Sequence, residues 1–375
     1  MEKNNKEINE GKAHLFLSDS VFYNARMKNL RDISVLFVRT MKDKDKTMSL
    51  LDCTAATGVR SIRYAKEVGI ENLTAIDINK DAANILFKNM KLNEVYGDFQ
   101  NISLQEFSSK PDNKKFDFID LDPFGSPQPY LNDIMKLSKD NTIVMITATD
   151  TAVLCGAHSN ACIKIYGAKP MHNKLCKESG IRILIMNIAK VAATFNMGIK
   201  PLISISDMHY MRVFIQLKYG AKKAVDSLKE LGFASFCKKC KEFDYKKGFA
   251  PELDKKCVYC NEKNELFGQF YLGEIKDNEV ISRMIEINKE INILNEKEVA
   301  FLLKIKNELH TPFFYSIPDI TKSLKHKSVS PDKIIEILDE GGFISTKTQF
   351  DKDGIKTTSK ISEVISALQK NSKIT

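Results

Sequence analysis

Three short apolar runs in the first third of the chain each end at an acidic residue. They are Leu50-Leu-Asp52, Leu73-Thr-Ala-Ile-Asp77 and Phe118-Ile-Asp-Leu-Asp122. A continuous apolar run that stops at a polar residue is typical of a strand buried on both faces of a parallel sheet. Because ligands of such sheets bind outside the carboxyl ends of the strands, the three acidic ends are predicted to face one crevice.

Helical patterns separate these runs. One helix is predicted to begin directly after Gly58, and another at Asp81, where an acidic cap precedes apolar residues spaced by three and four. Further buried strands are predicted at residues 142–147, 202–206 and 211–217. This alternation predicts an α/β fold with a doubly wound, mostly parallel, Rossmann-like sheet.

The sequence changes character near residue 220, where Lys-rich helical segments and a cysteine-rich stretch follow the last predicted strand. We therefore predict two domains, with residues 1–220 forming the sheet domain and residues 221–375 a smaller α+β domain. Within the latter, residues 310–365 hold helical patterns and a hairpin-like turn at Asp351-Lys-Asp-Gly354, a layout compatible with a winged helix.

The composition limits the class of protein. The chain has 375 residues, of which 43% are hydrophobic and 28% charged, as in globular proteins. No apolar run approaches the ~18 residues of a membrane span, and the first residues lack the apolar core of a signal peptide. We expect no membrane contact and, because eight clustered cysteines do not suit a disulfide scaffold, a reducing, cytoplasmic location. The net charge of +9 favours a polyanionic partner, although a general lysine bias would also explain it. The oligomeric state stays open, with a monomer slightly favoured.

The segment Asp52-Cys-Thr-Ala-Ala-Thr-Gly58 lies where a strand turns into a helix. Its small residues let backbone N–H groups approach a ligand, and a helix start adds positive potential. Asp77 ends the next strand nineteen residues after Gly58, where a carboxylate can accept hydrogen bonds from both ribose hydroxyls. Three glycines that would cradle a pyrophosphate are absent, so S-adenosylmethionine fits better than a dinucleotide.

The tripeptide Asp122-Pro123-Phe124 has the residue types needed to hold a planar amine. An exocyclic amine of a base is a poor nucleophile until acceptors hold its N–H protons, and a carboxylate and a proline carbonyl provide them. Phe124 can stack on the ring and orient the nitrogen. Guanine offers N1–H and N2–H side by side, which suits the carboxylate of Asp122, whereas adenine suits an amide better. Asp120 is a second candidate carboxylate.

Several segments of the chain resemble the tRNA guanine-26 N2-dimethyltransferase family, and the similarity runs over residues 10–365. The most specific are Asp122-Pro-Phe-Gly-Ser-Pro127 and Leu154-Cys-Gly-Ala-His158. Phe22-Tyr-Asn-Ala-Arg-Met27 and Gly180-Ile-Arg-Ile-Leu184 add to them. The resemblance implies transfer of one or two methyl groups from S-adenosylmethionine to N2 of guanine 26 of tRNA.

The resemblance also implies roles for individual residues. It makes Asp122 the catalytic acid and Phe22 and Phe124 the pair that stacks on the base. The cofactor contacts it implies are Arg31, Arg60 and Asp77. The family's Asp-Ala pair that contacts the cofactor's adenine is replaced here by Asn101-Ile102, which implies an amide and an apolar contact at that place.

Two Cys-x-x-Cys pairs, Cys237/Cys240 and Cys257/Cys260, are separated by sixteen residues. This spacing predicts a zinc ribbon in which four thiolates hold one structural Zn²⁺, while a redox pair is the alternative. Lysines around this segment form a candidate phosphate-binding surface, and we expect fewer than half of them to touch RNA. They are Lys222, Lys223, Lys238, Lys239, Lys246, Lys247, Lys255 and Lys256. The second domain is accordingly predicted to bind tRNA.

Two rival functions remain. An adenine N6 methyltransferase acting on RNA or DNA also uses acid-Pro-aromatic segments, and a non-catalytic tRNA-binding protein could keep a methyltransferase scaffold. Intact Asp77 and Asp122 argue against lost activity, while Asn101-Ile102 argues weakly for it. The number of methyl groups and the modification of a neighbouring guanine stay open.

Overall fold

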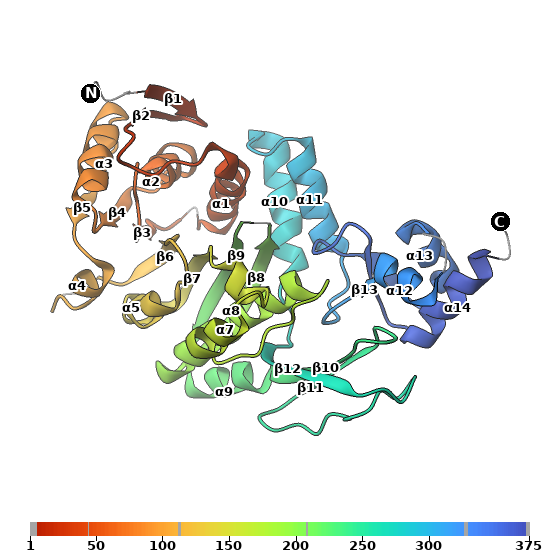
Figure 1. The fold of residues 1–375 in the computed structure, drawn as a ribbon. Coiled ribbons are helices and arrows are strands. Elements are labelled where there is room, and N and C mark those ends of the chain that lie inside the picture. Colours follow the sequence, from red (N-terminus) through yellow and green to blue (C-terminus); the bar gives the residue numbers. More distant parts are fainter. Residues whose placement is uncertain (1–5, 44, 112–113, 208, 326–328, 373–375) are drawn as a thin grey trace.

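A computed structural model describes residues 6–43, 45–111, 114–207, 209–325 and 329–372 of the chain. Figure 1 shows a large sheet flanked by helices in the N-terminal half. A second small sheet lies below it, and a helical C-terminal part lies at the right of that view.

The large sheet has seven strands in the order β5-β4-β3-β6-β7-β9-β8. The pairs from β5 to β7 are parallel, and β9 runs antiparallel to both β7 and β8. This mostly parallel sheet confirms the predicted fold class. Its strands are β3 (Ser49–Asp52), β4 (Asn72–Asp77), β5 (Asp98–Asn101), β6 (Phe116–Leu121), β7 (Ser138–Ala148), β8 (Met197–Ser206) and β9 (Met211–Tyr219).

The strands of this sheet are apolar because helices cover both faces. Alternate residues of β3 and β6 belong to different cores: Leu51 and Ile119 face one, and Leu50 and Phe118 the other. The helices of this half are α1 (Lys28–Met41), α2 (Val59–Arg63), α3 (Lys80–Leu92), α4 (Leu104–Ser108), α5 (Leu131–Lys136), α6 (Thr151–Leu154), α7 (Ser159–Tyr166), α8 (Cys176–Thr194) and α9 (Ala221–Lys229), with a π-helical turn η2 (Tyr64–Val68) and 3-10 turns η1 (Ala25–Met27) and η3 (Gln128–Tyr130).

An N-terminal hairpin of β1 (Lys6–Glu10) and β2 (Ala13–Leu17) precedes the sheet, and the sequence pattern did not reveal it. The second sheet consists of β11 (Phe243–Lys247), β10 (Leu231–Cys237) and β12 (Asn264–Tyr271), all antiparallel.

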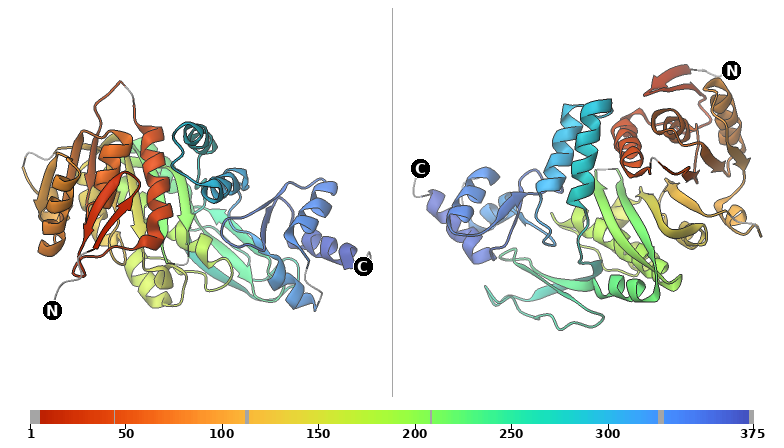
Figure 2. Two further views of the ribbon diagram at one scale, coloured as in Figure 1. Left: turned by 90° about the horizontal axis from the view of Figure 1, so that it is seen from above. Right: turned by 180° about the vertical axis from the view of Figure 1, so that it is seen from behind.

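Two helices from beyond residue 220 return to the first half of the chain. Figure 2 shows α10 (Asn278–Ile291) and α11 (Glu296–Asn307) beside α1. Ile281 and Leu302 share a hydrophobic core with Leu36 of α1. The domain boundary near residue 220 therefore stays a prediction, since the apolar core runs across it.

The C-terminal part contains β13 (Tyr315–Ser316), α12 (Ile317–Leu324), α13 (Pro331–Glu340), β14 (Ser345–Lys347), β15 (Gly354–Thr357) and α14 (Ile361–Ser372). The strand order is β13-β15-β14, and β14 and β15 form the hairpin expected around Asp351. This order of elements agrees with the winged helix that the sequence pattern suggested. Its helices pack around a separate core that includes Ile320, Ile334 and Leu368.

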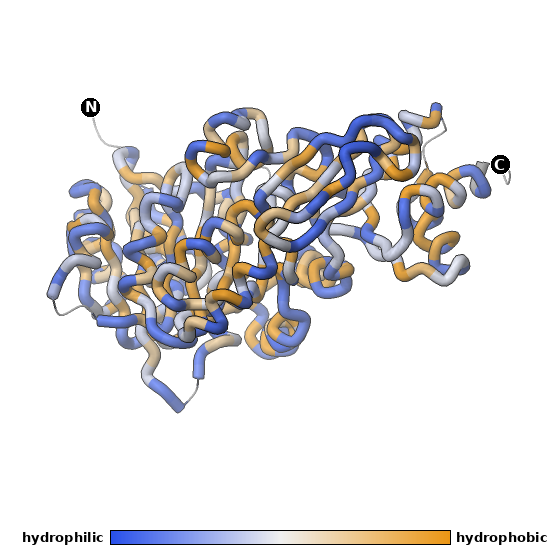
Figure 3. The backbone as a smooth tube through the Cα atoms, turned by 90° about the horizontal axis from the view of Figure 1, so that it is seen from below, coloured by the Kyte–Doolittle hydropathy of each residue, from blue (hydrophilic) through white to orange (hydrophobic). Residues whose placement is uncertain are grey.

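Hydrophobic and hydrophilic residues alternate along the backbone in Figure 3, as expected for helices with one apolar face. Among the described residues, no helix combines the length and the apolar character that crossing a membrane requires.

Candidate functional site

A cavity of about 390 Å³ opens at the carboxyl ends of β3, β4 and β6. A volume of this size suits a small-molecule ligand. Its wall combines the loop after β3, the end of β4, the segment after β6 and the loop that precedes α1. The lining residues include Phe22, Tyr23, Asn24, Arg31, Thr54, Ala55, Ala56, Arg60, Asp77, Ile78, Asp122, Pro123 and Phe124.

Asp77 is fixed against the loop that follows β3. One oxygen of its carboxylate accepts a hydrogen bond from the backbone N–H of Ala56 at 2.8 Å, and the other accepts one from the N–H of Asn79 at 2.8 Å. Ala56 has a φ of 48°, a left-handed conformation that bends the loop around the carboxylate. The arrangement orients Asp77 at the cavity wall and leaves lone pairs for a ligand.

Gly58 shapes this loop without lining the cavity. Its φ of 79° is one that glycine adopts readily, and a Cβ atom there would lie 2.7 Å from Leu86 Cδ1 of α3. The residue therefore allows both the turn into α2 and the close approach of α3.

Asp122 lies at the mouth of the cavity with its side chain 20% exposed. Arg60 Nη2 donates a hydrogen bond to its Oδ2 at 2.6 Å. Burial alone would raise the pKa of Asp122, but the charges of Arg60 and Arg212 outweigh it and hold the pKa below its usual range. Asp122 is therefore ionised near neutral pH and presents a carboxylate to the cavity.

Asp120 lies behind Asp122 and is fully buried. Arg212 Nη2 donates to both of its oxygens at 2.9 Å, and the Tyr64 hydroxyl donates at 2.6 Å. The predicted second carboxylate of the site thus does not line the cavity. Its carboxylate instead balances the charge of Arg212 and that of Arg60, whose Nη1 lies 4.0 Å from Oδ2.

Phe22 and Phe124 stand side by side at the cavity rim. Their ring centroids lie 4.8 Å apart at an interplanar angle of 78°, and the side chains are 51% and 76% exposed. The rings are in edge-to-face contact, so a planar base that stacks between them must displace one ring. Such exposed aromatic rings suit a transient stacking partner.

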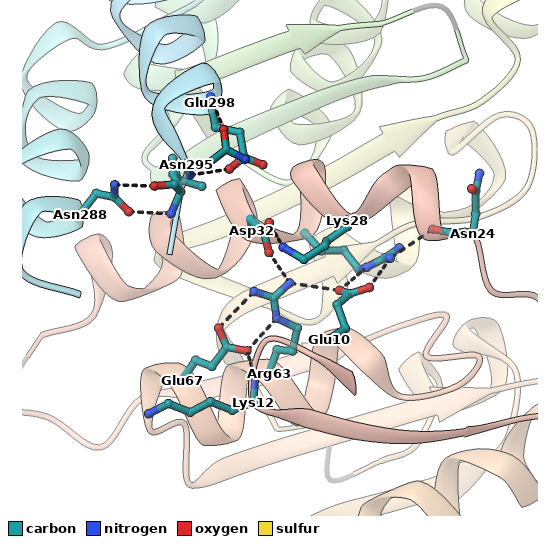
Figure 4. Close-up of polar contacts among 12 residues, drawn as sticks. Glu10, Lys12, Asn24, Lys28, Asp32, Arg63, Glu67, Asn288, Asn295 and Glu298 are labelled. Atoms are coloured by element: carbon teal, nitrogen blue, oxygen red, sulfur yellow. Dashed lines mark hydrogen bonds and ion pairs between the residues drawn. The ribbon is translucent and has the colours of Figure 1, made fainter. Parts of the chain in front are cut away.

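A buried ionic network supports the part of the cavity that Tyr23 and Arg31 line, and Figure 4 shows its central carboxylate, Glu10. Glu10 accepts hydrogen bonds from Arg31 Nε at 2.7 Å, from the Tyr23 hydroxyl at 2.7 Å and from Arg63 Nη1 at 3.0 Å. Burial would raise the pKa of Glu10, but its hydrogen bonds and the nearby arginine charges lower it to about 2. Arg31 also donates to the carbonyl of Asn24 at 3.1 Å, which ties the Phe22 loop to α1.

The structure brings most of the predicted site residues together. Six of them line the same cavity: Phe22, Arg31, Arg60, Asp77, Asp122 and Phe124. Asn101 and Ile102 do not line it. The Asn101 amide donates to the carbonyls of Asp77 and Ile78 at 2.8 and 3.0 Å, and Ile102 packs against the core. A contact of this pair with adenine stays a prediction.

Sequence reasoning missed Glu10 and Arg212, the charged residues behind the cavity. The signal for Arg212 is a charged side chain within the apolar strand Met211-Arg-Val-Phe-Ile215, where an unpaired charge would be costly. Glu10 carries no comparable signal, because the mostly polar segment Lys6-Glu-Ile-Asn-Glu10 is typical of a solvent-exposed stretch.

The four cysteines of the two Cys-x-x-Cys pairs come together at the end of β10. Their Sγ atoms all lie within 4.8 Å of one another, and the Cys237–Cys260 and Cys240–Cys257 distances are 3.5 Å. Tetrahedral Zn²⁺ with Zn–S bonds of about 2.3 Å requires sulfurs roughly 3.8 Å apart. The cluster fits a four-thiolate zinc site.

Comparisons with known proteins agree with this geometry. The family model described as N2,N2-dimethylguanosine tRNA methyltransferase matches residues 3–369. A tRNA (guanine(26)-N(2))-dimethyltransferase of Thermococcus kodakarensis is 35% identical, with 96% of each chain covered, and one of Methanobrevibacter smithii is 36% identical, with 93% of this chain and 92% of the relative covered. The solved structure of Trm1 from Pyrococcus horikoshii in complex with S-adenosyl-L-methionine matches with a TM-score of 0.87 and 33% identity, over 96% of this chain and 99% of that one. A match over nearly the whole length, together with the cavity, shows that the chain belongs to the N2,N2-dimethylguanosine tRNA methyltransferase family.

Proposed function

We propose that this protein transfers methyl groups from S-adenosylmethionine to the exocyclic N2 of guanine 26 in tRNA. One observation carries the proposal: Asp77, Asp122 and the Phe22–Phe124 pair line a single cavity. The cavity thus joins a carboxylate suited to a ribose with a carboxylate and rings suited to a base. The proposal includes a structural Zn²⁺ at the cysteine cluster and a tRNA-binding role for residues 221–375.

The cofactor fits the half of the cavity beside β3 and β4. Asp77 offers acceptors for the ribose hydroxyls, and the small side chains of Ala55 and Ala56 leave their backbone accessible. Arg31, which lines the same cavity, would help Asp77 to hold the cofactor. When bound, S-adenosylmethionine supplies an electrophilic methyl group on a sulfonium centre.

Asp122 holds the target base by hydrogen bonds and accepts its proton. As an ionised carboxylate it accepts the N1–H and N2–H hydrogen bonds of guanine in the plane of the ring, which leaves the N2 lone pair, perpendicular to that plane, free to receive the methyl group. The nitrogen becomes strongly acidic as it gains a methyl group, so even a carboxylate with a lowered pKa can take up the proton. Arg60 holds Asp122 in place through its 2.6 Å hydrogen bond.

The target base must leave its stack to reach Asp122. Unstacking costs a few kcal/mol, which stacking on aromatic side chains offsets. The exposed rings of Phe22 and Phe124 provide that platform once they separate.

We expect Asp77→Ala to weaken S-adenosylmethionine binding at least tenfold. The change removes two charge-assisted hydrogen bonds to the ribose, each worth about 1.5–3 kcal/mol, and loosens the loop that Asp77 holds. Titration calorimetry measures the effect. Asp81→Ala, on the exposed start of α3, is the matched control and should bind normally. An unchanged affinity of Asp77→Ala would place the cofactor elsewhere.

A tRNA transcript with inosine at position 26 tests the proposed acceptor atom. Inosine lacks only the N2 amine, so methyl transfer should fall to background while binding of the transcript changes little. Transfer is followed with isotopically labelled cofactor, and the unmodified transcript is the control. Methylation of the inosine transcript at that nucleoside would show that another atom is the acceptor.

A further inference from the structure

A lysine-rich cleft of about 1060 Å³ is lined by residues next to the four cysteines. Six lysines and two glutamates line it, together with Asn264 and Leu266. The lysines are Lys169, Lys238, Lys239, Lys255, Lys256 and Lys263, and all six are exposed. Glu265 pairs with Lys238 at 2.6 Å and Glu262 with Lys239 at 3.8 Å, so the lining keeps a net charge of +4 (six minus two).

The backbone around the cysteines forces these lysines together. Lys256 and Lys263 face each other in an isolated antiparallel bridge, and the N–H of Asn264 donates to the Lys255 carbonyl at 2.9 Å. Like charges directly across a pair of strands are destabilising. A bound anion would relieve this repulsion, so we expect the surface to bind one.

A tight turn at each Cys-x-x-Cys pair fixes the positions of the lysines next to it. The N–H of Lys241 donates to the Cys237 carbonyl at 2.9 Å, and the N–H of Asn261 donates to the Cys257 carbonyl at 2.9 Å. Both donors have left-handed φ angles, 70° and 56°. Lys238 and Lys239 thereby lie on the first turn, between two cysteines of the proposed zinc site.

The sixth lysine connects the cleft to the cavity for the base. Lys169 comes from the first half of the chain, and its backbone exchanges hydrogen bonds with Gly268 of β12 at 2.6 and 3.0 Å. Three residues earlier, the Tyr166 hydroxyl contacts Ser126 Oγ at 2.7 Å. Three residues span at most about 11 Å, and Ser126 follows Phe124 by two residues. The Lys169 end of the cleft is therefore linked to the segment after Phe124 through Tyr166 and Ser126.

The chemistry of the cleft favours a nucleic-acid backbone. Its described lining contains no aromatic ring on which an unpaired base could stack and no arginine for bidentate recognition, while Leu266 is its one apolar residue. Flexible ammonium groups without base contacts bind phosphates and position a duplex without reading its sequence. We infer that this cleft binds the phosphate backbone of a base-paired arm of the tRNA whose guanine enters the cavity.

This inference rests on the proposed function, and it changes the set of lysines that are expected to contact tRNA. Of the eight lysines expected from the sequence, four lie in the cleft, and Lys169 and Lys263 join them. Lys222 and Lys223 lie on α9 instead.

The test compares two triple variants of the full chain. The cleft variant is Lys169→Gln, Lys255→Gln and Lys256→Gln; the control is Lys222→Gln, Lys223→Gln and Lys229→Gln on α9, where all three lysines are also exposed. We expect the cleft variant to bind a tRNA transcript at least about tenfold more weakly at 0.15 M salt. The slope of log affinity against log salt concentration should decrease by about 2–3, near one per lost phosphate contact. The control should retain affinity and slope.

Turnover at saturating tRNA separates this inference from the proposed function. The cleft variant should keep the turnover number and the S-adenosylmethionine affinity of the unsubstituted protein, because none of its changes touches the cavity. Equal affinity and slope in the cleft variant and the unsubstituted protein, with tRNA still methylated, would overturn the inference alone. The same holds if the α9 control loses the affinity instead, or if the cleft captures an acidic protein but not tRNA. Failure of the unsubstituted protein to methylate tRNA would overturn the proposed function itself.

Discussion

Replacing Asp122 by asparagine should reduce turnover by about 10²-fold or more while S-adenosylmethionine binding stays near normal. An amide at this position can still accept one hydrogen bond from Arg60, so the wall of the cavity is kept. It can neither accept both N–H groups of guanine as a carboxylate does nor take up the N2 proton, and loss of a catalytic base typically costs this much. Single-turnover methylation with saturating tRNA measures the chemical step directly.

Asp117→Asn is the matched control for this variant. Asp117 lies on the same strand, β6, but near its start, where it pairs with Lys139 at 2.7 Å. It should lose a little stability and no turnover. Because the arginine charges hold the pKa of Asp122 below its usual range, protonation of this group should not lower the rate at neutral or mildly acidic pH. A well-folded Asp122→Asn protein with near-normal turnover would refute the assigned role.

Of the predicted changes, loss of the proposed zinc should lower the stability of the protein most. The segment between β10 and β12 buries little apolar surface: Val258 is 83% exposed and Phe249 69%. Without a metal it has few interactions to hold its shape, as in other small zinc sites that fold only with metal. Cys257→Ser should therefore abolish zinc binding, lower the melting temperature by roughly 5–10 °C and weaken tRNA binding, while S-adenosylmethionine binding persists.

Elemental analysis of protein purified under reducing conditions gives the first measurement for this prediction. We expect one zinc per chain in the unsubstituted protein and in Cys155→Ser, whose half-buried cysteine lies outside the cluster. Absence of zinc from the unsubstituted protein would contradict the assignment. So would a Cys257→Ser protein that loses cofactor binding while keeping its affinity for tRNA.

The parts of the fold that the sequence predicts are those with local signals. The strands of the large sheet are buried on both faces, so they read as continuous apolar runs, and Asp77 and Asp122 end two of these runs. The cysteine cluster is predictable because its spacing is a local constraint. These local signals explain why most of the cavity residues are predictable from the sequence.

The remaining features depend on contacts between distant residues. The lowered pKa of Asp122 requires Arg212, which lies ninety residues later and reaches the site only because β9 pairs with β7. The first hairpin depends on Glu10 being buried against Arg31 and Arg63, which no local pattern indicates. Likewise, the packing of α10 on α1 joins the two halves of the chain across more than two hundred residues.

Nucleoside mass spectrometry identifies both the methylated nucleotide and the methylated atom. An unmodified tRNA transcript is incubated with the protein and methyl-labelled S-adenosylmethionine, digested to nucleosides and analysed beside a transcript in which guanosine 26 is replaced by adenosine. We expect labelled N2-methylguanosine and N2,N2-dimethylguanosine from the first transcript and neither from the second. Labelled N6-methyladenosine, label that persists after the replacement, or no label in any nucleoside would contradict it.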